Sequence, residues 1–441
     1  MDISRRGLFK LALAGGCLHT VSSVGFAAPA LTQSEPLTTV ALDNGLRVHC
    51  YRNASRYISA ALILRSKEIG AHGGLAHILE HTSFTGAAGN MTAAELKQKR
   101  RALIQDSNAM TSPGKLEWYA TFLPKYASEA LHLLAVTCLD QKFDQETVKS
   151  EARVVLEELL LDKYSSEGAI KRRFNSIIYG KDHPYGNDTL DSELAVAKMP
   201  VRKLAEELRR YADMIRLPAN MDLFLVGNVE PRQICDLANE HFGKCPYASG
   251  PMLNVPRVER TRTHTRMSGI ASNLSRPMGE IRIAWNTGVA IGDPDANVLL
   301  ALGEYLNELL FSELREKHGD AYSPEAGYEP DSCSGIFSIV LTTRKPLREV
   351  EKRIFSILER VKDHIDPAEL ELYRDRWELK RLKLVESSES TLEALVARLV
   401  EGCALEDLAI ERVSADEMVA AARKYFPTYK GGYVCVNLRG I

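Results

Sequence analysis

The sequence has almost no net charge, so it lacks the excess of basic residues that marks proteins which bind polyanions. Its 56 lysines and arginines nearly balance its 58 aspartates and glutamates, and the formal net charge is −2. The densest basic run, Lys97-Gln98-Lys99-Arg100-Arg101, falls in a segment with helical periodicity and is typical of a solvated helix face. We therefore expect no nucleic-acid partner.

Paired cysteine motifs and long apolar runs are also missing. The eight cysteines include no Cys-x-x-Cys pair, and we expect most of them to be small buried core residues. Cys235 and Cys245 remain open as a disulfide because they are the pair nearest in sequence. No stretch after residue 30 is long and apolar enough to span a bilayer, so we expect no integral membrane segment in the mature chain.

The first thirty residues have the composition of an export signal. Arg5 and Arg6 precede a short apolar stretch, and small residues follow at 27–30. The segment 4–10 resembles a twin-arginine signal, which predicts a periplasmic protein. A lipid anchor at Cys17 is the weaker alternative, because a larger aliphatic residue than Ala14 usually stands three positions before such a cysteine.

The rest of the chain has the length of two domains with similar element order. A chain of 441 residues suits about two domains of roughly 200 residues each. Strand signals open the first part, followed by helices and a strand near 221–226. A similar order of strands and helices begins again near 280. Residues 246–278 show no sustained periodicity and are typical of a linker. We predict an α+β fold with related domains at 36–245 and 279–441, each an antiparallel sheet backed by helices.

The informative motif is His77-Ile78-Leu79-Glu80-His81. Residues four apart lie one above the other on a helix, so His77 and His81 can direct imidazole nitrogens to one metal. Glu80 lies on the same face, close enough to accept a proton from an activated water. This order, H-x-x-E-H, is the inverted signature of zinc peptidases. A chance match on an amphipathic helix is the competing interpretation, but it leaves two histidines and a glutamate crowded on an apolar helix.

The segments 74–81 and 84–86 resemble the pitrilysin/insulinase family of zinc metallopeptidases. The resemblance implies a third zinc ligand at Glu158, which lies 77 positions after His81. It also implies that Glu151, two helical turns earlier, orients a ligand histidine. Segment 107–112 resembles the edge strand with which this family binds extended substrates, which assigns Asn108 and Ala109 to substrate binding.

The segment 314–322 resembles an arginine–tyrosine pair of the same family. By this resemblance Tyr322 stabilises the oxyanion of the tetrahedral intermediate and Arg315 holds the substrate backbone. The resemblance therefore predicts a zinc endopeptidase, a hydrolase with one zinc per chain, that cleaves short unstructured peptides.

Two chains are needed to complete the clamshell that this family builds from four such domains. We expect a homodimer in which Arg315 and Tyr322 act on the metal site of the partner, or a heterodimer with a homologous subunit. A non-catalytic peptide-binding or scaffold subunit is the alternative function, although such subunits usually lack a ligand or the base. An unrelated zinc protein is a third possibility, which would leave the arginine–tyrosine pair unexplained.

Overall fold

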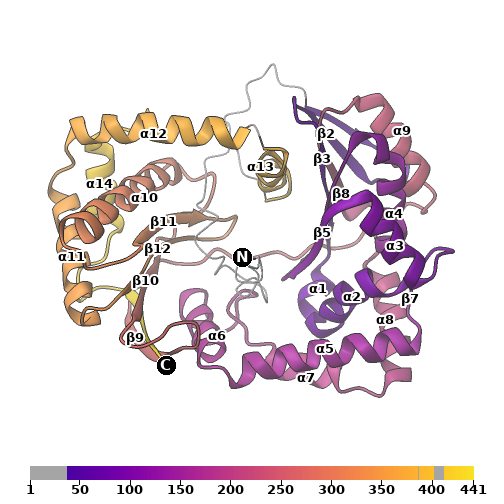
Figure 1. Cartoon of the computed structure of the whole chain (residues 1–441), viewed down its shortest axis with the longest axis horizontal. Helices are drawn as coiled ribbons and strands as arrows, with labels where there is room; N and C mark the ends of the chain where they lie inside the picture. The colour runs from indigo at the N-terminus through magenta and orange to yellow at the C-terminus, as the bar shows by residue number, and fades with distance from the viewer. Residues whose placement is uncertain (1–36, 386, 402–411) are drawn as a thin grey trace, which may run out of the picture.

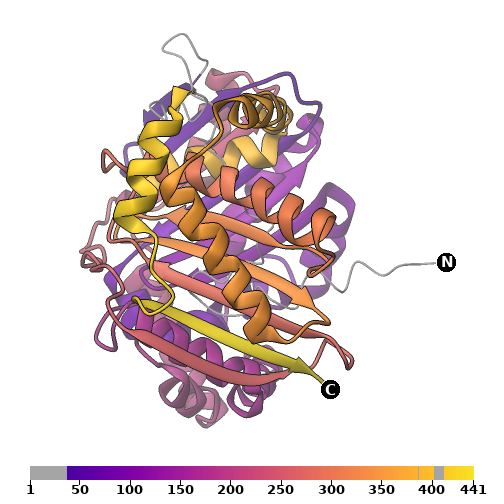
Figure 2. The ribbon, with the colours of Figure 1, turned by 90° about the vertical axis from the view of Figure 1, so that its left-hand side faces the viewer.

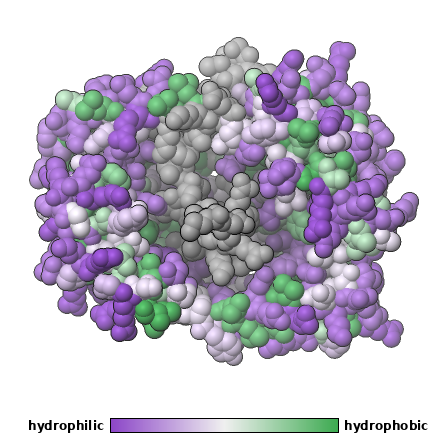
Figure 3. All heavy atoms as spheres, in the orientation of Figure 1, coloured by the Kyte–Doolittle hydropathy of each residue, from purple (hydrophilic) through white to green (hydrophobic). Residues whose placement is uncertain are grey.

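The computed structural model describes residues 37–385, 387–401 and 412–441. The predicted export signal at 1–30 and the candidate lipid site at Cys17 lie outside the described residues. Within the described part, none of the helices combines the length and the apolar character needed to cross a membrane. Hydrophilic residues predominate on the described surface in Figure 3, with small hydrophobic patches between them.

The first half of the chain forms a six-stranded sheet in the order β1-β2-β8-β3-β6-β5. Its strands are β1 (Leu37–Ala41), β2 (Arg47–Arg52), β3 (Ile58–Arg65), β5 (Ile104–Ser112), β6 (Lys115–Phe122) and β8 (Met221–Gly227). A hairpin turn at Asn44-Gly45 joins β1 to β2, and Gly45 has a φ of 88°, which favours glycine. Among the described strands, β5 pairs only with β6 and forms one edge of the sheet.

Nine helices of the described chain accompany this sheet in sequence. They are α1 (Lys67–Ala71), α2 (Gly73–Thr85), α3 (Ala93–Leu103), α4 (Ala127–Leu139), α5 (Gln145–Tyr164), α6 (Ser166–Ile178), α7 (Leu190–Ala197), α8 (Val201–Ile215) and α9 (Pro231–Phe242). A two-stranded sheet of β4 (Ala87–Ala88) and β7 (Gln141–Lys142) completes this half. The helix starts follow local signals: Thr92 and Glu95 form a capping box on α3, and Asp144 caps α5.

The second half forms a five-stranded sheet in the order β11-β12-β10-β13-β9. Its strands are β9 (His264–Ala271), β10 (Gly279–Asn286), β11 (Glu325–Pro330), β12 (Gly335–Thr343) and β13 (Tyr433–Gly440). The described helices are α10 (Ala296–Leu310), α11 (Leu347–Asp363), α12 (Pro367–Val385), α13 (Ser388–Glu401) and α14 (Ala415–Tyr425). Helix α10 is continued by a π-helical segment, Phe311–Lys317. Figure 2 shows α10, α11 and α14 lying across the outer face of this sheet.

The two sheets share one topology. Apart from β1, the first sheet has five strands, which are, from first to fifth along the chain, β2, β3, β5, β6 and β8. Across the sheet they lie in the order first, fifth, second, fourth, third. The five strands of the second sheet, β9 to β13, lie in the same order. The first and fifth strands run parallel in both sheets, as β2 with β8 and as β9 with β13, whereas the other neighbours are antiparallel. The predicted α+β class with two related sheets is therefore confirmed, and each sheet contains one parallel pair in addition.

Each half contributes one helix to the sheet of the other half. Helix α13 packs Leu392, Leu395 and Val396 against Phe224 and Val226 of the first sheet. Reciprocally, the side chains of α6 pack on the second sheet beside those of β9 and β13. In Figure 1 the two sheets face each other, with α13 and α6 near opposite ends of the space between them and most other helices outside.

The predicted linker at 246–278 is wrong for its last part, because β9 lies inside it. The sequence of β9 has polar residues and a glycine, so it shows little local strand signal. Its partner, β13, lies more than 150 residues later in the chain, and all eight residues of β9 pair with it in parallel. The pairing is therefore decided by tertiary contacts, and the second sheet begins before residue 279.

Candidate metal centre

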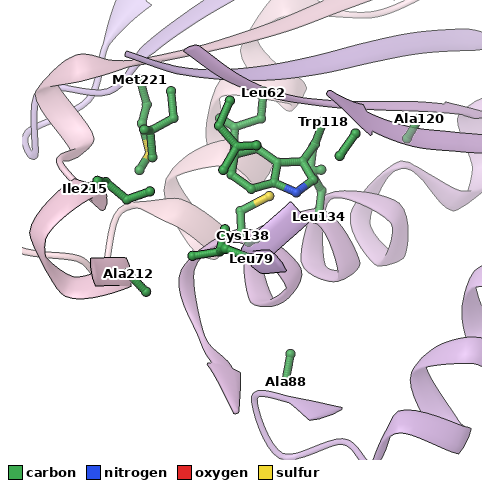
Figure 4. Close-up of a cluster of buried hydrophobic side chains, with 14 of the residues drawn as sticks. Leu62, Leu79, Ala88, Trp118, Ala120, Leu134, Cys138, Ala212, Ile215 and Met221 are labelled. Carbon is green, nitrogen blue, oxygen red and sulfur yellow. The ribbon is translucent and has the colours of Figure 1, made fainter. Parts of the chain in front are cut away.

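Helix α2 carries the H-x-x-E-H motif and is held in the core by its opposite face. Ile78, Leu79 and Ser83 are buried, and the Trp118 indole nitrogen on β6 donates a hydrogen bond of 3.2 Å to Ser83 Oγ. Figure 4 shows Leu79 and Trp118 in one apolar cluster with Leu62 and Leu134. Burial of this face leaves the histidines and the glutamate of the motif directed away from the core.

The structure brings the three predicted ligands together. Nε2 of His77 lies 3.4 Å from Oε2 of Glu158 on α5, and Nε2 of His81 lies 3.5 Å from the same oxygen. One ligand atom from each residue lies within 4.8 Å of the other two. Glu157, the neighbouring carboxylate, is exposed and pairs with Arg153 instead, at 3.8 Å. Helical rotation therefore directs Glu158 to the histidines and Glu157 away from them.

The charges of this cluster are strongly coupled. Burial opposes protonation of His77, but the carboxylates of Glu158 and Glu193 outweigh it and raise the pKa of His77 to about 9. The two imidazoles, His77 first, lower the pKa of Glu158 to about 2. For His81, burial again lowers the pKa, but the Glu158 carboxylate outweighs it, and the net shift is upward.

The donor set fits a divalent metal ion. Oε2 of Glu158 is buried and makes no hydrogen bond with any part of the chain that the structure describes. Two imidazole nitrogens face this oxygen, so a cation that all three atoms share would satisfy it. Two histidines and one glutamate are the protein ligands of catalytic zinc sites, which keep a fourth position open.

Glu80 lies beside this cluster and is linked to the edge strand. Its Oε2 accepts a hydrogen bond of 2.6 Å from the Thr111 hydroxyl on β5. Burial raises the pKa of Glu80, against this hydrogen bond and against the charges of His77 and His81. A carboxylate with a raised pKa next to a metal position is suited to accept a proton near neutral pH. The sequence did not identify Thr111 as a partner of Glu80.

The edge strand places the two predicted substrate-binding residues differently. Asn108 is exposed, whereas Ala109 is buried with its side chain in the core of the first half. A side-chain contact between substrate and Ala109 is therefore excluded in this conformation. Because no other strand in the described part of the chain pairs with the outer side of β5, this edge can accept an added strand through the backbone.

Two carboxylates face the second nitrogens of the ligand histidines. Glu151 is buried on α5, and its Oε2 lies 3.4 Å from Nδ1 of His81, in the position that the resemblance implies. Glu193 on α7 occupies the same relation to His77, with 3.7 Å between its Oε2 and Nδ1. No motif marks Glu193 in the sequence, and only the packing of α7 beside α2 and α5 reveals it.

The arginine–tyrosine pair belongs to the second half. Arg315 lies in the π-helical segment after α10, donates a hydrogen bond to the Tyr322 carbonyl and stacks over its ring at 4.7 Å. Tyr322 is 69% exposed. No hydrogen bond or ion pair found among the described residues joins this pair to His77, His81 or Glu158.

Two regions of the chain match the models of one peptidase family. Residues 67–191 match the family described as Insulinase (Peptidase family M16), and residues 203–376 match the description Peptidase M16 inactive domain. The first match contains the H-x-x-E-H motif and Glu158, and the second contains Arg315 and Tyr322.

Individual relatives agree with this assignment. The chain is 27% identical over 335 residues to an uncharacterised zinc protease of Mycobacterium leprae, covering 71% of each protein. It resembles the crystal structure of a protease from Helicobacter pylori, with a TM-score of 0.77, 19% identity, and coverage of 92% of this chain and 100% of that one. It also resembles a peptidase M16 inactive domain from Pseudomonas fluorescens, with a TM-score of 0.73, 16% identity, and coverage of 92% and 98%. The chain belongs to the pitrilysin/insulinase family of zinc peptidases, peptidase family M16.

Proposed function

We propose that this protein is a zinc-dependent endopeptidase that hydrolyses short unstructured peptides. The observation that carries the proposal is the convergence of Nε2 of His77, Nε2 of His81 and Oε2 of Glu158, with Glu80 one helical position before His81. In a site of this composition zinc supplies Lewis-acid chemistry: it polarises the peptide carbonyl and activates water.

The residues of the chain account for the remaining steps. Glu80 accepts the proton of the attacking water and later delivers it to the leaving amine. Strand β5 holds the substrate as an added strand through its free backbone edge, which suits a peptidase of broad specificity. Tyr322 donates its hydroxyl hydrogen to the oxyanion of the tetrahedral intermediate, and Arg315 binds the substrate backbone.

We propose further that Arg315 and Tyr322 act on the metal centre of a second chain. Tyr322 is exposed and Arg315 is half-buried, and no contact joins them to the metal-ligand cluster of their own chain as far as the structure describes it. The shared topology of the two halves favours a two-fold dimer, in which the second half of one chain faces the first half of the other. A homodimer contains two complete sites of this kind, and a heterodimer with a homologue is the alternative assembly.

The competing function is a non-catalytic peptide-binding or scaffold subunit. It is favoured by the match of residues 203–376 to an inactive domain. However, all three metal-ligand residues and Glu80 lie in the other match, at 67–191, and the complete set favours catalysis.

The experiment measures zinc content and peptide hydrolysis on the purified mature chain alone. We expect about one zinc per chain and cleavage of unstructured peptides. Glu158→Gln should lose zinc and activity, whereas the matched control Glu157→Gln, which changes the exposed neighbour, should keep both. Glu80→Gln should keep zinc and lose activity. Absence of zinc from the wild-type chain would refute the proposal, and zinc without hydrolysis would favour a binding role or an obligate heterodimer.

Complementation of two inactive variants tests the assembly. In a homodimer with sites shared between chains, mixing Glu80→Gln with Tyr322→Phe creates one site with Glu80 and Tyr322 both intact in each mixed dimer. Random exchange then restores about one quarter of the wild-type activity. If Tyr322 acts within its own chain, no mixture regains activity.

Export to the periplasm is part of the proposal and rests on the sequence of residues 1–30. Replacement of Arg5 and Arg6 by lysines should abolish export by the twin-arginine route, as measured by cell fractionation. Export unaffected by this change would point to a different route.

A further inference from the structure

Each candidate ligand histidine has its second ring nitrogen opposite a carboxylate. Nδ1 of His81 faces Glu151 at 3.4 Å, and Nδ1 of His77 faces Glu193 at 3.7 Å. Carboxylates in this relation fix the tautomer and orientation of metal-ligating histidines and increase their basicity. The two contacts come from different elements, α5 for Glu151 and α7 for Glu193.

The absence of a side chain at Gly74 allows α7 to come this close to the metal-binding helix. A Cβ atom on Gly74 would stand 2.9 Å from Cβ of Val196 and 3.0 Å from Cα of Glu193, distances that real Cβ atoms do not tolerate without movement. At Gly73 a Cβ would lie 3.5 Å from Oε1 of Glu193, an ordinary van der Waals contact, so the close approach depends on Gly74. Residues 73 and 74 precede His77 by one helical turn, so the close approach is made beside the ligand.

The carboxylate of Glu193 is itself held in place. Its Oε1 accepts a hydrogen bond of 2.5 Å from the Thr189 hydroxyl one turn earlier, which leaves Oε2 directed to His77. The side chain is only 17% exposed, so solvent screens its charge weakly. The contact with Nδ1 is an ion-pair distance, and a movement of about 1 Å would convert it into a hydrogen bond.

We propose that Glu193 is a positioning residue for the metal centre, which holds His77 with Nε2 directed to Glu158 and Nδ1 protonated. The proposal rests on the proposed zinc site and goes beyond it, because Glu193 is not one of the three residues whose atoms converge on the metal position. Gly74 contributes indirectly, because the absence of a side chain there lets α7 and Glu193 lie beside α2. The metal centre therefore depends on three helices, α2, α5 and α7, rather than on the two that carry its ligands.

Zinc affinity tests this role directly. Metal-free wild-type protein, Glu193→Gln, Glu193→Ala and Asp191→Asn are titrated with zinc against a chelator of known affinity. Asp191 is the matched control, because it lies on the same helix but is exposed and pairs with Lys163 at 2.9 Å. We expect both Glu193 variants to bind zinc about 10- to 100-fold more weakly and Asp191→Asn to stay within about two-fold of wild type.

A second measurement separates positioning from folding. The thermal midpoints of the metal-free proteins should agree between Glu193→Gln and wild type, because glutamine keeps the volume of the side chain and an acceptor for Thr189. The visible spectrum of the cobalt-substituted Glu193→Gln protein should differ from that of wild type, as expected when a ligand imidazole changes orientation. Zinc affinity of Glu193→Gln equal to that of Asp191→Asn would overturn the proposal while leaving the zinc site intact. Failure of the wild-type chain to bind zinc would instead refute the proposed function.

Discussion

Asp222 is the centre of a buried charge network on the face of the first sheet that α13 covers. Arg47 binds both of its oxygens at 2.6 Å, and His49 and Arg65 lie at 3.0 Å. Burial alone would raise the pKa of Asp222, but the hydrogen bonds from His49 and Arg47 and the charges of Arg47 and Arg65 lower it to about 2. Arg65 also donates to the Val400 carbonyl of α13, so the network links the two halves.

The magnitude follows from the change in pKa on folding. A decrease from 3.8 to about 2 corresponds to about 2.5 kcal/mol of stability. The Arg47 side chain is 33% exposed and Arg65 is 19% exposed, so solvent screening reduces the expected contribution to about 2 kcal/mol. Because the pKa is lowered in the folded state, this stability is present above the unfolded pKa and is lost as the pH falls toward 2.

The assay compares urea unfolding of wild type, Asp222→Asn and Asp236→Asn between about pH 2.5 and pH 7. Metal-free protein is used, so that release of zinc in acid does not contribute. Asp222→Asn should be destabilised by at least about 2 kcal/mol at neutral pH, since the amide also leaves the arginines without a counter-charge, and the difference should shrink in acid. The exposed Asp236 on α9 is the matched control, with a change within about 0.5 kcal/mol. A difference that stays constant with pH would refute the electrostatic reasoning.

Further predictions concern the packing of α13 on the first sheet, the contact between α2 and α7, and the metal. Leu395→Ala removes a fully buried side chain of α13 that packs on the first sheet. It should lower the free energy of unfolding, measured in urea, by about 2–5 kcal/mol. A decrease below about 0.5 kcal/mol would show that this contact of α13 does not stabilise the protein. Gly74→Ala places a Cβ 2.9 Å from Cβ of Val196. It should destabilise the protein by about 1–3 kcal/mol and also weaken zinc binding. Stability and zinc affinity equal to those of wild type would show that α7 can move away from α2 without affecting the fold or the metal centre. Chelation of the metal should abolish peptide hydrolysis, and added zinc should restore it. The far-ultraviolet circular dichroism of the metal-free protein should stay near that of the zinc-loaded protein, because the ligands lie on helices that pack in the core. Activity that survives chelation would contradict a metal mechanism.

Local sequence patterns predicted much of the fold. The helix of the H-x-x-E-H motif, the strand near 221–226 and the repeat of the element order from near 280 all depend on neighbouring residues, whose spacing can be read from the sequence. Strand β9 could not be predicted in this way. Its sequence has little strand signal, and it is ordered by parallel pairing with β13 at the far end of the chain.

In the candidate site, too, some residues could be identified from the sequence and others only from the tertiary structure. Helical spacing alone places His77 and His81 on one face, and resemblance to a family supplies Glu158 and Glu151. The contacts of Glu193 with His77 and of Thr111 with Glu80 join elements that are separate in sequence, and no spacing rule relates them.

By itself, then, the sequence determined the chemistry of the metal ligands, the doubled element order and most of the secondary structure, because these depend on residue type and short-range periodicity. Only the tertiary structure decided that α6 and α13 each pack on the sheet of the other half, and that α7 places the Glu193 carboxylate beside His77. These are contacts between distant segments, and they are set by which surfaces can pack together, down to the absence of a side chain at Gly74.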